Sequence, residues 1–337
     1  MADQRPGVLV FGSLNVDHVL RVQRLPRSGE TVLSRDYQCY PGGKGRNQAV
    51  AVAAAGGRVS IAGTVGDDGA GKLLLADVDR AGVERSMVQI VPETPTGVAL
   101  ITVDDDGENT IVVHPGANSC AKPVEAEALD QGAYRVVLCC LEVPLASVEA
   151  TLGAARSEGL ITVVNASPLD AAADETLEVV LLRADVVVVN RSEAVALAGR
   201  LSHRRFAQTN TAKKWSGGSN PTEEPEIPVE RLAQDIGSWL VGDGPASRRL
   251  PKLIVTLGAE GVVYVDAEGV HSVPAYEVKV ESTVGAGDAF AGVLCHALAC
   301  EHQIEAAVKL AVAAGAAQVS VGLSPTSLAE IVRRPVS

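Results

Sequence analysis

Residues 160–199 read LITVVNASPLDAAADETLEVVLLRADVVVVNRSEAVALAG. The pattern of a predicted strand followed by a predicted helix occurs twice in this stretch. Each copy opens with a short β-branched apolar run, at 160–165 and at 185–190, and continues into an Ala- and Leu-rich stretch of helical composition. The runs do not alternate with polar residues, which is typical of parallel strands buried on both faces. This stretch therefore predicts a parallel β-sheet that is covered by helices on both sides.

The same alternation continues in both directions along the chain. It predicts an α/β fold with a mostly parallel, doubly wound sheet flanked by helices. The further predicted strands lie at 8–12, 58–62, 135–141 and 252–257, and the predicted helices lie at 67–81, 146–158, 172–183, 191–199, 228–241, 285–300 and 304–319.

Two segments break this pattern. Residues 14–40 read as extended and half-polar, and residues 96–114 read as a hairpin that turns at an Asp-Gly pair. Because neither segment fits a parallel sheet, we expect them to pair into a small β lid. The expected division is a lid of 14–40 and 96–114, an α/β core of 1–13, 41–95 and 115–337, and a flexible, polar surface insertion at 203–227 within the core.

Composition disfavours several classes of partner. The 337 residues include 29 Lys and Arg against 41 Asp and Glu, a net charge of −12, whereas binders of nucleic acid or anionic membranes need a basic face. We find no signal-peptide pattern at the N-terminus and no apolar run of the ~20 residues that a membrane span needs. The six cysteines form no metal-binding spacing, so we expect reduced thiols in a cytoplasmic protein.

Polar residues recur where the predicted strands end. In an open α/β sheet, ligands bind beyond the carboxyl ends of the strands, so these residues predict a polar ligand cleft. They are Gly12–Asp17, Leu141–Glu142, Asn165, Asn190 and Thr256–Gly258.

The strongest local feature is TVGAGDAF at 283–290. The Gly-Ala-Gly run precedes an Ala-rich helix, and the free amides of a helix N-terminus form an anion site. Asp288 then has two interpretations. It complements the helix dipole, or it is a general base that faces a hydroxyl beside the phosphate being transferred.

The stretch PGGKGRNQ at 41–48 opens a second predicted helix. Three glycines within four residues indicate a close approach of the backbone to a neighbour. Lys44 and Asn47 are one turn apart and share a face that suits a polyol. The alternative is a Gly-rich helix start that carries a surface lysine.

Three other patterns are weaker. Asn190 and Glu193 form a near capping box, or they order water around a Mg²⁺ ion on nucleotide phosphates. GDDGAGK at 66–72 resembles a phosphate-binding loop, but Leu73 replaces the Ser or Thr that would bind Mg²⁺, so we interpret it as a turn and helix cap. No glycine run completes a Rossmann fingerprint, which disfavours a nicotinamide oxidoreductase.

Taken in order, these motifs resemble the ribokinase family of carbohydrate kinases, the PfkB group. The resemblance covers nearly the whole chain and is weakest at 200–230. It rests on Gly12–Asp17, Gly42–Ala49, Gly116–Asn118, Leu141–Glu142, Asn190–Glu193, Thr256–Gly261 and Gly285–Asp288.

The resemblance implies ATP-dependent phosphorylation of D-ribose at its 5-hydroxyl, in a homodimer that forms through the lid. Asn15, Asp17, Gly43, Lys44, Asn47, Glu142 and Asp288 would bind the sugar. Asp288 would be the catalytic base, and the amides of Gly285, Ala286 and Gly287 would form the anion hole. Asn190, Thr256, Gly258, Gly261 and Gly287 would contact the nucleotide, and Asn190 and Glu193 would lie near Mg²⁺. Ser282, Val284, Gly322 and Thr326 would occupy the places of a monovalent-cation site.

The chain departs from the family pattern at that last site. Ser282 stands where relatives usually carry an aspartate that binds the activating cation, and the loop at 322–326 is altered as well. We therefore expect activity to depend less on K⁺ than in a relative with the aspartate. Arg46, where alanine is common, is a second and milder departure.

Two competing interpretations stay open. The chain could be a kinase of 2-deoxyribose, another pentose or a nucleoside, or it could be a catalytically silent sugar-binding protein. A substrate panel separates the kinases, and consumption of ATP separates a kinase from a silent binder.

Overall fold

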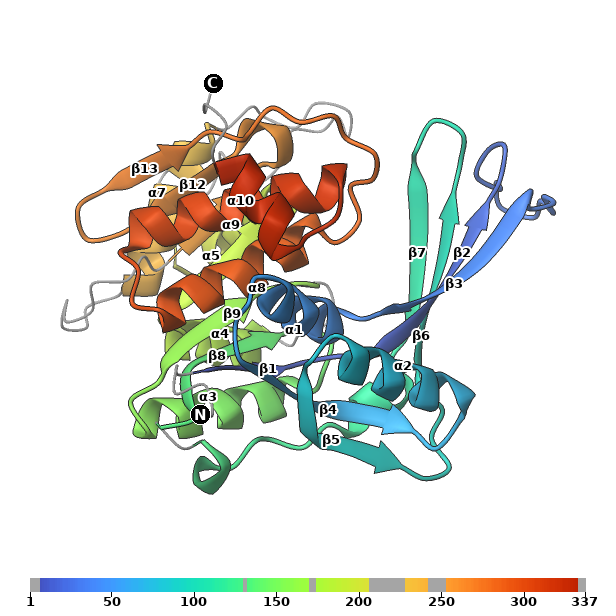
Figure 1. Ribbon diagram of the computed structural model, residues 1–337. Helices are drawn as coiled ribbons and strands as arrows, with labels where there is room; N and C mark the ends of the chain where they lie inside the picture. The colour runs from blue at the N-terminus through green and yellow to red at the C-terminus, as the bar shows by residue number, and fades with distance from the viewer. Residues whose placement is uncertain (1–6, 130–131, 170–173, 206–227, 242–252, 333–337) are drawn as a thin grey trace.

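The computed structural model describes residues 7–129, 132–169, 174–205, 228–241 and 253–332. Its centre is a nine-stranded sheet in the order β13-β12-β11-β10-β9-β8-β1-β4-β5 (Figure 1). Neighbouring strands run parallel except at β11–β12 and β12–β13, which are antiparallel. The strands are β1 (Gly7–Phe11), β4 (Val59–Gly66), β5 (Glu84–Val91), β8 (Tyr134–Cys140), β9 (Ile161–Asn165), β10 (Val186–Asn190), β11 (Leu253–Thr256), β12 (Val262–Val265) and β13 (Val270–Val273).

Helices cover both faces of this sheet. Alternate residues of β1 enter two separate cores, with Val8 and Val10 on one face and Leu9 and Phe11 on the other. The first core is closed by α1 (Lys44–Ala54), α2 (Gly69–Arg80), α8 (Ala286–Ala299), α9 (Ile304–Ser320) and α10 (Pro325–Val332), and the second by α3 (Leu145–Ser157), α4 (Asp174–Arg183), α5 (Arg191–Arg205) and α7 (Val229–Val241). Short 3₁₀ turns lie at Gly116–Cys120, Ala126–Ala128 and Gly258–Glu260.

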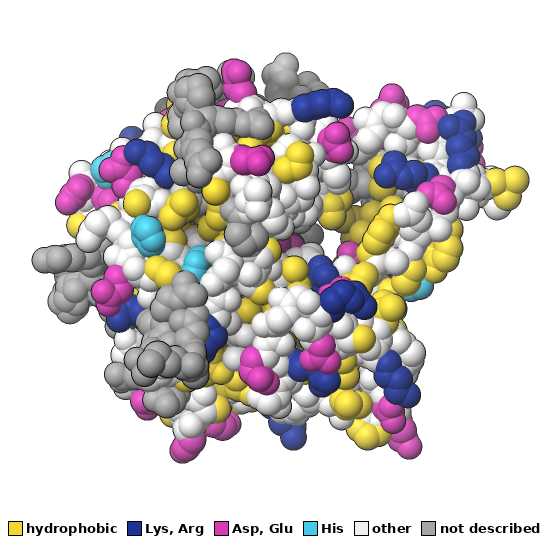
Figure 2. All heavy atoms as spheres, viewed as in Figure 1, with side chains coloured by type: hydrophobic (Ala, Val, Ile, Leu, Met, Phe, Trp, Pro, Cys, Tyr) yellow, Lys and Arg dark blue, Asp and Glu magenta, His cyan; other side chains and the backbone are white. Residues whose placement is uncertain are grey.

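A second sheet of four strands projects from the core as an arm (Figure 1). Its order is β3-β2-β6-β7, formed by β2 (Asn15–Arg21), β3 (Asp36–Gly42), β6 (Gly97–Val103) and β7 (Asn109–His114). The two chain segments join through β2 and β6, which run parallel, whereas the outer pairs are antiparallel. In the space-filling view, yellow apolar side chains line this arm, and a hollow separates it from the helical body (Figure 2).

The α/β fold class predicted from the sequence is confirmed. GDDGAGK forms a turn and helix cap, because Asp68 is the N-cap of α2 and its side chain accepts the Gly71 N–H. Strands β5, β12 and β13 and helix α10 were not predicted. The predicted insertion at 203–227 begins inside α5, which extends to Arg205, and the rest of it lies outside the described residues.

The order of the strands fixes where a ligand can bind. From β1 the chain adds β4 and β5 on one side of the sheet and then β8 to β11 on the other side. The strand order therefore reverses between β1 and β8, and this place is called the switch point below. The carboxyl ends of these two strands open the crevice in which ligands of doubly wound folds bind. None of the described helices combines the length and apolar character that a membrane crossing requires.

Candidate active site

The turn after β1 meets the residues after β8 at the switch point. The Ser13 hydroxyl donates a hydrogen bond to Glu142 Oε2, and the backbone N–H of Lys44 donates to the same oxygen over 3.3 Å. Because Lys44 is the first residue of α1, three elements converge on one carboxylate.

Glycines allow α1 to approach this turn closely. Gly43, the N-cap of α1, has φ of 89°, in the left-handed region that favours glycine. A Cβ atom on Gly45 would lie 2.5 Å from the carbonyl carbon of Gly12. The close approach predicted from the glycine cluster is therefore made to the chain's own β1–β2 turn.

Asp288 lies in the first turn of α8 and faces α1. Asn47 Nδ2 donates to Asp288 Oδ2 over 3.1 Å, and Gln48 Nε2 donates to Oδ1 over 3.0 Å. Burial raises the pKa of Asp288 above its ordinary value, although the Lys44 charge and the two amide hydrogen bonds oppose the rise. Each carboxylate oxygen offers two acceptor sites, so both oxygens keep one for an incoming hydroxyl.

Asp17, on β2, lies close enough to Glu142 and Asp288 for their charges to act on its carboxylate. Burial, followed by the nearby Glu142 carboxylate, raises the pKa of Asp17 to about 6, while Arg46 opposes the rise. A carboxylate in a cleft whose pKa is raised by burial and by a second carboxylate is a candidate functional group.

Lys44 is the cation among these acids. Burial lowers the pKa of Lys44, but nearby acidic groups, led by the Asp288 and Glu142 carboxylates, oppose it and leave the pKa above its ordinary value. Lys44 is therefore protonated at neutral pH and offsets part of the repulsion between the carboxylates.

Asn15 is fixed by a residue from a distant part of the chain. The amide nitrogen of buried Asn118 donates to Asn15 Oδ1 over 2.7 Å, and its oxygen accepts the Leu14 N–H over 3.0 Å. Asn118 therefore sets the orientation of Asn15 at the base of the arm.

Two connected cavities lie at the N-terminus of α8, and Asp288 lines the smaller one. The larger, of about 850 Å³, has many apolar side chains in its wall and is bordered by all five residues expected along the nucleotide: Asn190, Thr256, Gly258, Gly261 and Gly287. The smaller, of about 230 Å³, is lined by Lys44, Asn165, Glu193 and Asp288, among others. The two cavities share the residues Asn190, Thr256, Thr283, Ala286 and Gly287, so a molecule in the larger cavity can reach into the smaller one beside Asp288.

Asn190 and Glu193 form a reciprocal capping box. The Glu193 N–H donates to Asn190 Oδ1 over 2.8 Å, and the Asn190 N–H donates to Glu193 Oε2 over 2.8 Å. The capping interpretation is thus correct for α5. Since both side chains also border the smaller cavity, capping does not remove them from a site for hydrated metal.

Three of the four residues at the places of a monovalent-cation site already take part in hydrogen bonds. Gln318 Nε2 donates to the Val284 carbonyl over 3.4 Å, and the Ser327 hydroxyl donates to the Gly322 carbonyl over 2.8 Å. The Ser282 hydroxyl accepts the Val284 N–H over 3.3 Å. The Val284 and Gly322 carbonyls thus each accept one hydrogen bond and keep a second acceptor site, Ser282 supplies no carboxylate, and Thr326 is exposed. A weakened cation site at these residues stays a prediction.

Sequence reasoning did not assign roles to three residues that shape the site. Ser13 contacts Glu142, Gln48 contacts Asp288, and Asn118 holds Asn15. All three lie inside or beside the quoted motifs. Their place in these motifs was therefore the signal in the sequence that could have pointed to them. No periodicity indicates which side chain of a motif faces the site.

Comparisons with known proteins agree with this geometry. The family model for pfkB family carbohydrate kinases matches residues 5–220 and 243–330. A ribokinase from Haemophilus influenzae is 30% identical over 319 residues, which cover 94% of this chain and 93% of that protein. A deoxyribokinase from Salmonella typhi is 28% identical over 309 residues, 90% of each chain. The crystal structure of a ribokinase from Cryptococcus neoformans in complex with ADP matches with a TM-score of 0.77 and 30% identity, covering 99% of this chain and 100% of that one.

The fold and these matches make the protein a kinase that phosphorylates an alcohol group. Within that class, the chain belongs to the pfkB family of carbohydrate kinases, with ribokinases among its relatives.

Proposed function

We propose that the protein transfers the γ-phosphoryl group of ATP to the 5-hydroxyl of D-ribose, giving D-ribose 5-phosphate and ADP. The observation that carries the proposal is the position of Asp288. Its carboxylate is held by Asn47 and Gln48 and borders a cavity that continues into the larger one. The relatives named as ribokinases support this substrate.

The sugar lies between the arm and the core in this proposal. Carboxylate, amide and ammonium groups around the switch point would hold its hydroxyls, and the arm would act as a lid that excludes water. Binding through several hydroxyls orients the 5-hydroxyl toward the nucleotide. The proposed sugar-binding residues are Asn15, Asp17, Gly43, Lys44, Asn47, Glu142 and Asp288.

The transfer is a single displacement. The ribose O5–H bond breaks as its proton moves to Asp288, O5 bonds to the γ-phosphorus, and the bond between that phosphorus and the bridging oxygen breaks with its electron pair leaving on ADP. The first N–H groups of α8, from Gly285 to Gly287, lack intrahelical acceptors and carry the positive end of the helix dipole. They would stabilise the charge on the phosphoryl oxygens.

The smaller cavity fits hydrated Mg²⁺. Amide and carboxylate oxygens are ligands that Mg²⁺ accepts directly or through water, and Asn190 and Glu193 supply them on the path to Asp288. When bound, Mg²⁺ would neutralise charge on the phosphate oxygens.

The decisive experiment is ADP release measured with a panel of pentoses and nucleosides. We expect the highest kcat/KM with D-ribose. A clear preference for 2-deoxyribose or a nucleoside would instead identify a kinase of that substrate. The relative named as a deoxyribokinase is the reason to include 2-deoxyribose in the panel. Absence of ADP release with every sugar, together with tight sugar binding, would instead identify a silent binder.

We expect the initial rate with ribose to stay nearly flat when K⁺ replaces choline at constant ionic strength. The reason is that Ser282 supplies no charge and the Val284 and Gly322 carbonyls already accept hydrogen bonds. A K⁺ titration of initial rate measures this. Ser282→Asp is the matched variant and should gain cation dependence, whereas a steep, saturable rise with K⁺ in the unmodified protein would contradict the prediction.

We also propose a homodimer that forms through the arm. Leu100 on β6 and Val112 on β7 are paired in register on one face of the sheet and are 50% and 67% exposed. A second copy of the chain would cover this apolar face. The proposal also includes a cytoplasmic location, which the six free cysteines support.

Val112→Glu should convert the dimer to a monomer, because it places a charge in the apolar contact. Light scattering after size-exclusion chromatography measures the mass. Leu182→Glu, a similar change at a 44% exposed position on α4, is the control and should leave the mass unchanged. A Val112→Glu protein that remains dimeric would place the interface elsewhere.

A further inference from the structure

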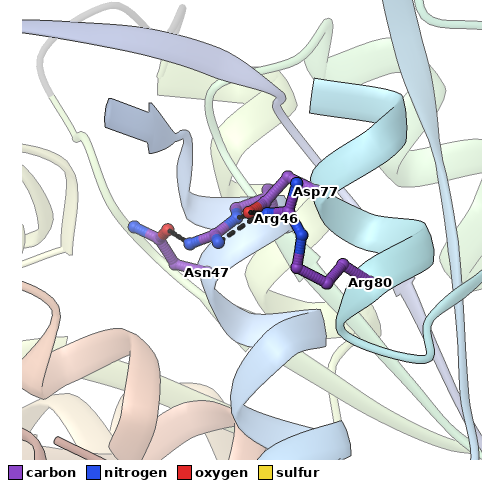
Figure 3. Close-up of polar contacts among 4 residues, drawn as sticks. All are labelled: Arg46, Asn47, Asp77 and Arg80. Atoms are coloured by element: carbon purple, nitrogen blue, oxygen red, sulfur yellow. Dashed lines mark hydrogen bonds and ion pairs between the residues drawn. The ribbon is translucent and has the colours of Figure 1, made fainter. Parts of the chain in front are cut away.

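Arg46 lies beside the proposed site and has no place in the mechanism described above. Its Nη1 donates to Asn47 Oδ1 over 3.0 Å (Figure 3). The same Asn47 side chain donates to Asp288 through Nδ2. Arg46 therefore occupies the oxygen end of an amide whose nitrogen end contacts the proposed base.

The orientation of this amide matters for Asp288. With Nδ2 toward the carboxylate, Asn47 donates a hydrogen bond, whereas the flipped amide would set Oδ1 against a carboxylate oxygen and repel it. A guanidinium donor on Oδ1 favours the first orientation, because flipping would bring the NH₂ group against a cation that can only donate.

Arg46 is itself held by a second helix. Its Nε donates to Asp77 Oδ2 over 2.8 Å, and Nη2 contacts the same oxygen, while Arg80 approaches Asp77 Oδ1 at 3.4 Å (Figure 3). The side chains of Arg46 and Asp77 are only 18% and 13% exposed, so solvent screens this pair less than a surface ion pair. The Asp77 carboxylate thus fixes the guanidinium plane.

Helix α2, which carries Asp77, is also fastened in place. Its N-cap residue Asp68 accepts the Thr96 N–H over 2.8 Å and the Thr96 hydroxyl over 2.7 Å, just before β6. Asp77, which binds Arg46, therefore lies on a helix that hydrogen bonds hold in place against the core.

We propose that Arg46, anchored by Asp77, is a positioning residue that orients the Asn47 amide and through it the Asp288 carboxylate. The inference rests on the proposed role of Asp288 as the base. It assigns a function to Arg46, the residue of PGGKGRNQ that lies between the proposed sugar-binding residues and Asp77 of α2.

Arg46 has a second effect, on Asp17. The charged groups that act on the Asp17 carboxylate are Glu142 and Asp288, which raise its pKa, and Arg46 and Lys44, which lower it. Loss of the Arg46 charge should therefore shift the acid limb of the kcat/KM profile for the sugar to higher pH.

The test compares Arg46→Ala with Arg46→Lys. We expect kcat to fall about 10-fold in both, because neither side chain can bridge Asp77 and Asn47, and a misplaced reacting group is costly. The acid limb should shift in Arg46→Ala alone, because lysine keeps the charge. The KM for ATP should not change in either variant. If Arg46→Ala does not fold, the kcat of Arg46→Lys alone tests the positioning role.

Arg85→Ala is the matched control. It removes an arginine that binds Asp79, also on α2, over 2.6 Å and 2.9 Å at an exposed position. It should leave kcat and the pH profile unchanged. A kcat for Arg46→Lys equal to that of the unmodified protein would overturn the proposal, as would an equal fall in Arg85→Ala.

A double variant separates this proposal from the proposed function. In the Asp288→Asn background, Arg46→Lys should lower kcat no further, because the group that it positions is already lost. An additive loss would overturn the positioning role while leaving Asp288 as the base. A fully active Asp288→Asn protein would instead overturn the proposed function itself.

Discussion

Asp288→Asn is expected to lower kcat at least about 100-fold, the low end for removal of a positioned general base. Asparagine has nearly the same shape but cannot take a proton from the substrate hydroxyl. Burial raises the pKa of Asp288, so the carboxylate is a stronger base than an ordinary aspartate. Steady-state turnover with saturating ribose and ATP measures the effect.

Thermal unfolding provides the control for this variant. If Asp288 only complements the dipole of α8, the change removes about 0.3–1 kcal/mol of stability and leaves turnover nearly intact. If Asp288 is the base, the melting temperature stays within a few degrees while turnover collapses. A kcat close to that of the unmodified protein would therefore remove Asp288 from the catalytic role.

The central strands could be predicted because they are buried on both faces. The run DVVVVN at 185–190 corresponds to β10 with four of five residues buried, and its composition alone indicates a strand. Strand β5 lies at an edge of the sheet, carries Glu84, Arg85 and Gln89, and lacks such a run. Strands β12 and β13 contain only four residues each and depend on tertiary pairing, β12 with β11 and β13 with β12. Short and edge strands leave a weak local signal.

The sequence motifs predicted which segments form the site, but not which side chains contact one another there. GAGD and GGKG indicate a helix N-terminus and a close backbone approach, and the structure has both. The contact of Gln48 with Asp288 joins residues 240 positions apart, and that of Asn118 with Asn15 joins residues 103 positions apart. Pairings of this kind depend on the packing of α1 against α8 and of β2 against the core. No periodicity in the sequence encodes them.

Removing either acidic group of the proposed sugar site is expected to weaken ribose binding about 10-fold or more while leaving ATP binding nearly unchanged. Asp17→Ala and Glu142→Ala each delete a carboxylate acceptor, and a hydrogen bond to a charged group contributes about 1.5–3 kcal/mol. Both residues lie around the switch point, and neither borders the two cavities proposed for the nucleotide and its phosphates. Calorimetric titration with ribose and, separately, with a non-hydrolysable ATP analogue measures the two affinities.

Asp17→Asn separates binding from stability, because the two should change in opposite directions. The folded pKa of Asp17 is about 6 against an ordinary 3.8, so protonated Asp17 favours the folded state below pH 3.8 and this contribution is lost as the pH rises through 6. At pH 7.5 the buried charge costs up to about 3 kcal/mol, and the asparagine variant should be more stable. Ribose affinity should rise with pH through about 6 in the unmodified protein only. Unchanged ribose affinity in this variant, or an affinity independent of pH in the unmodified protein, would exclude Asp17 from the sugar site.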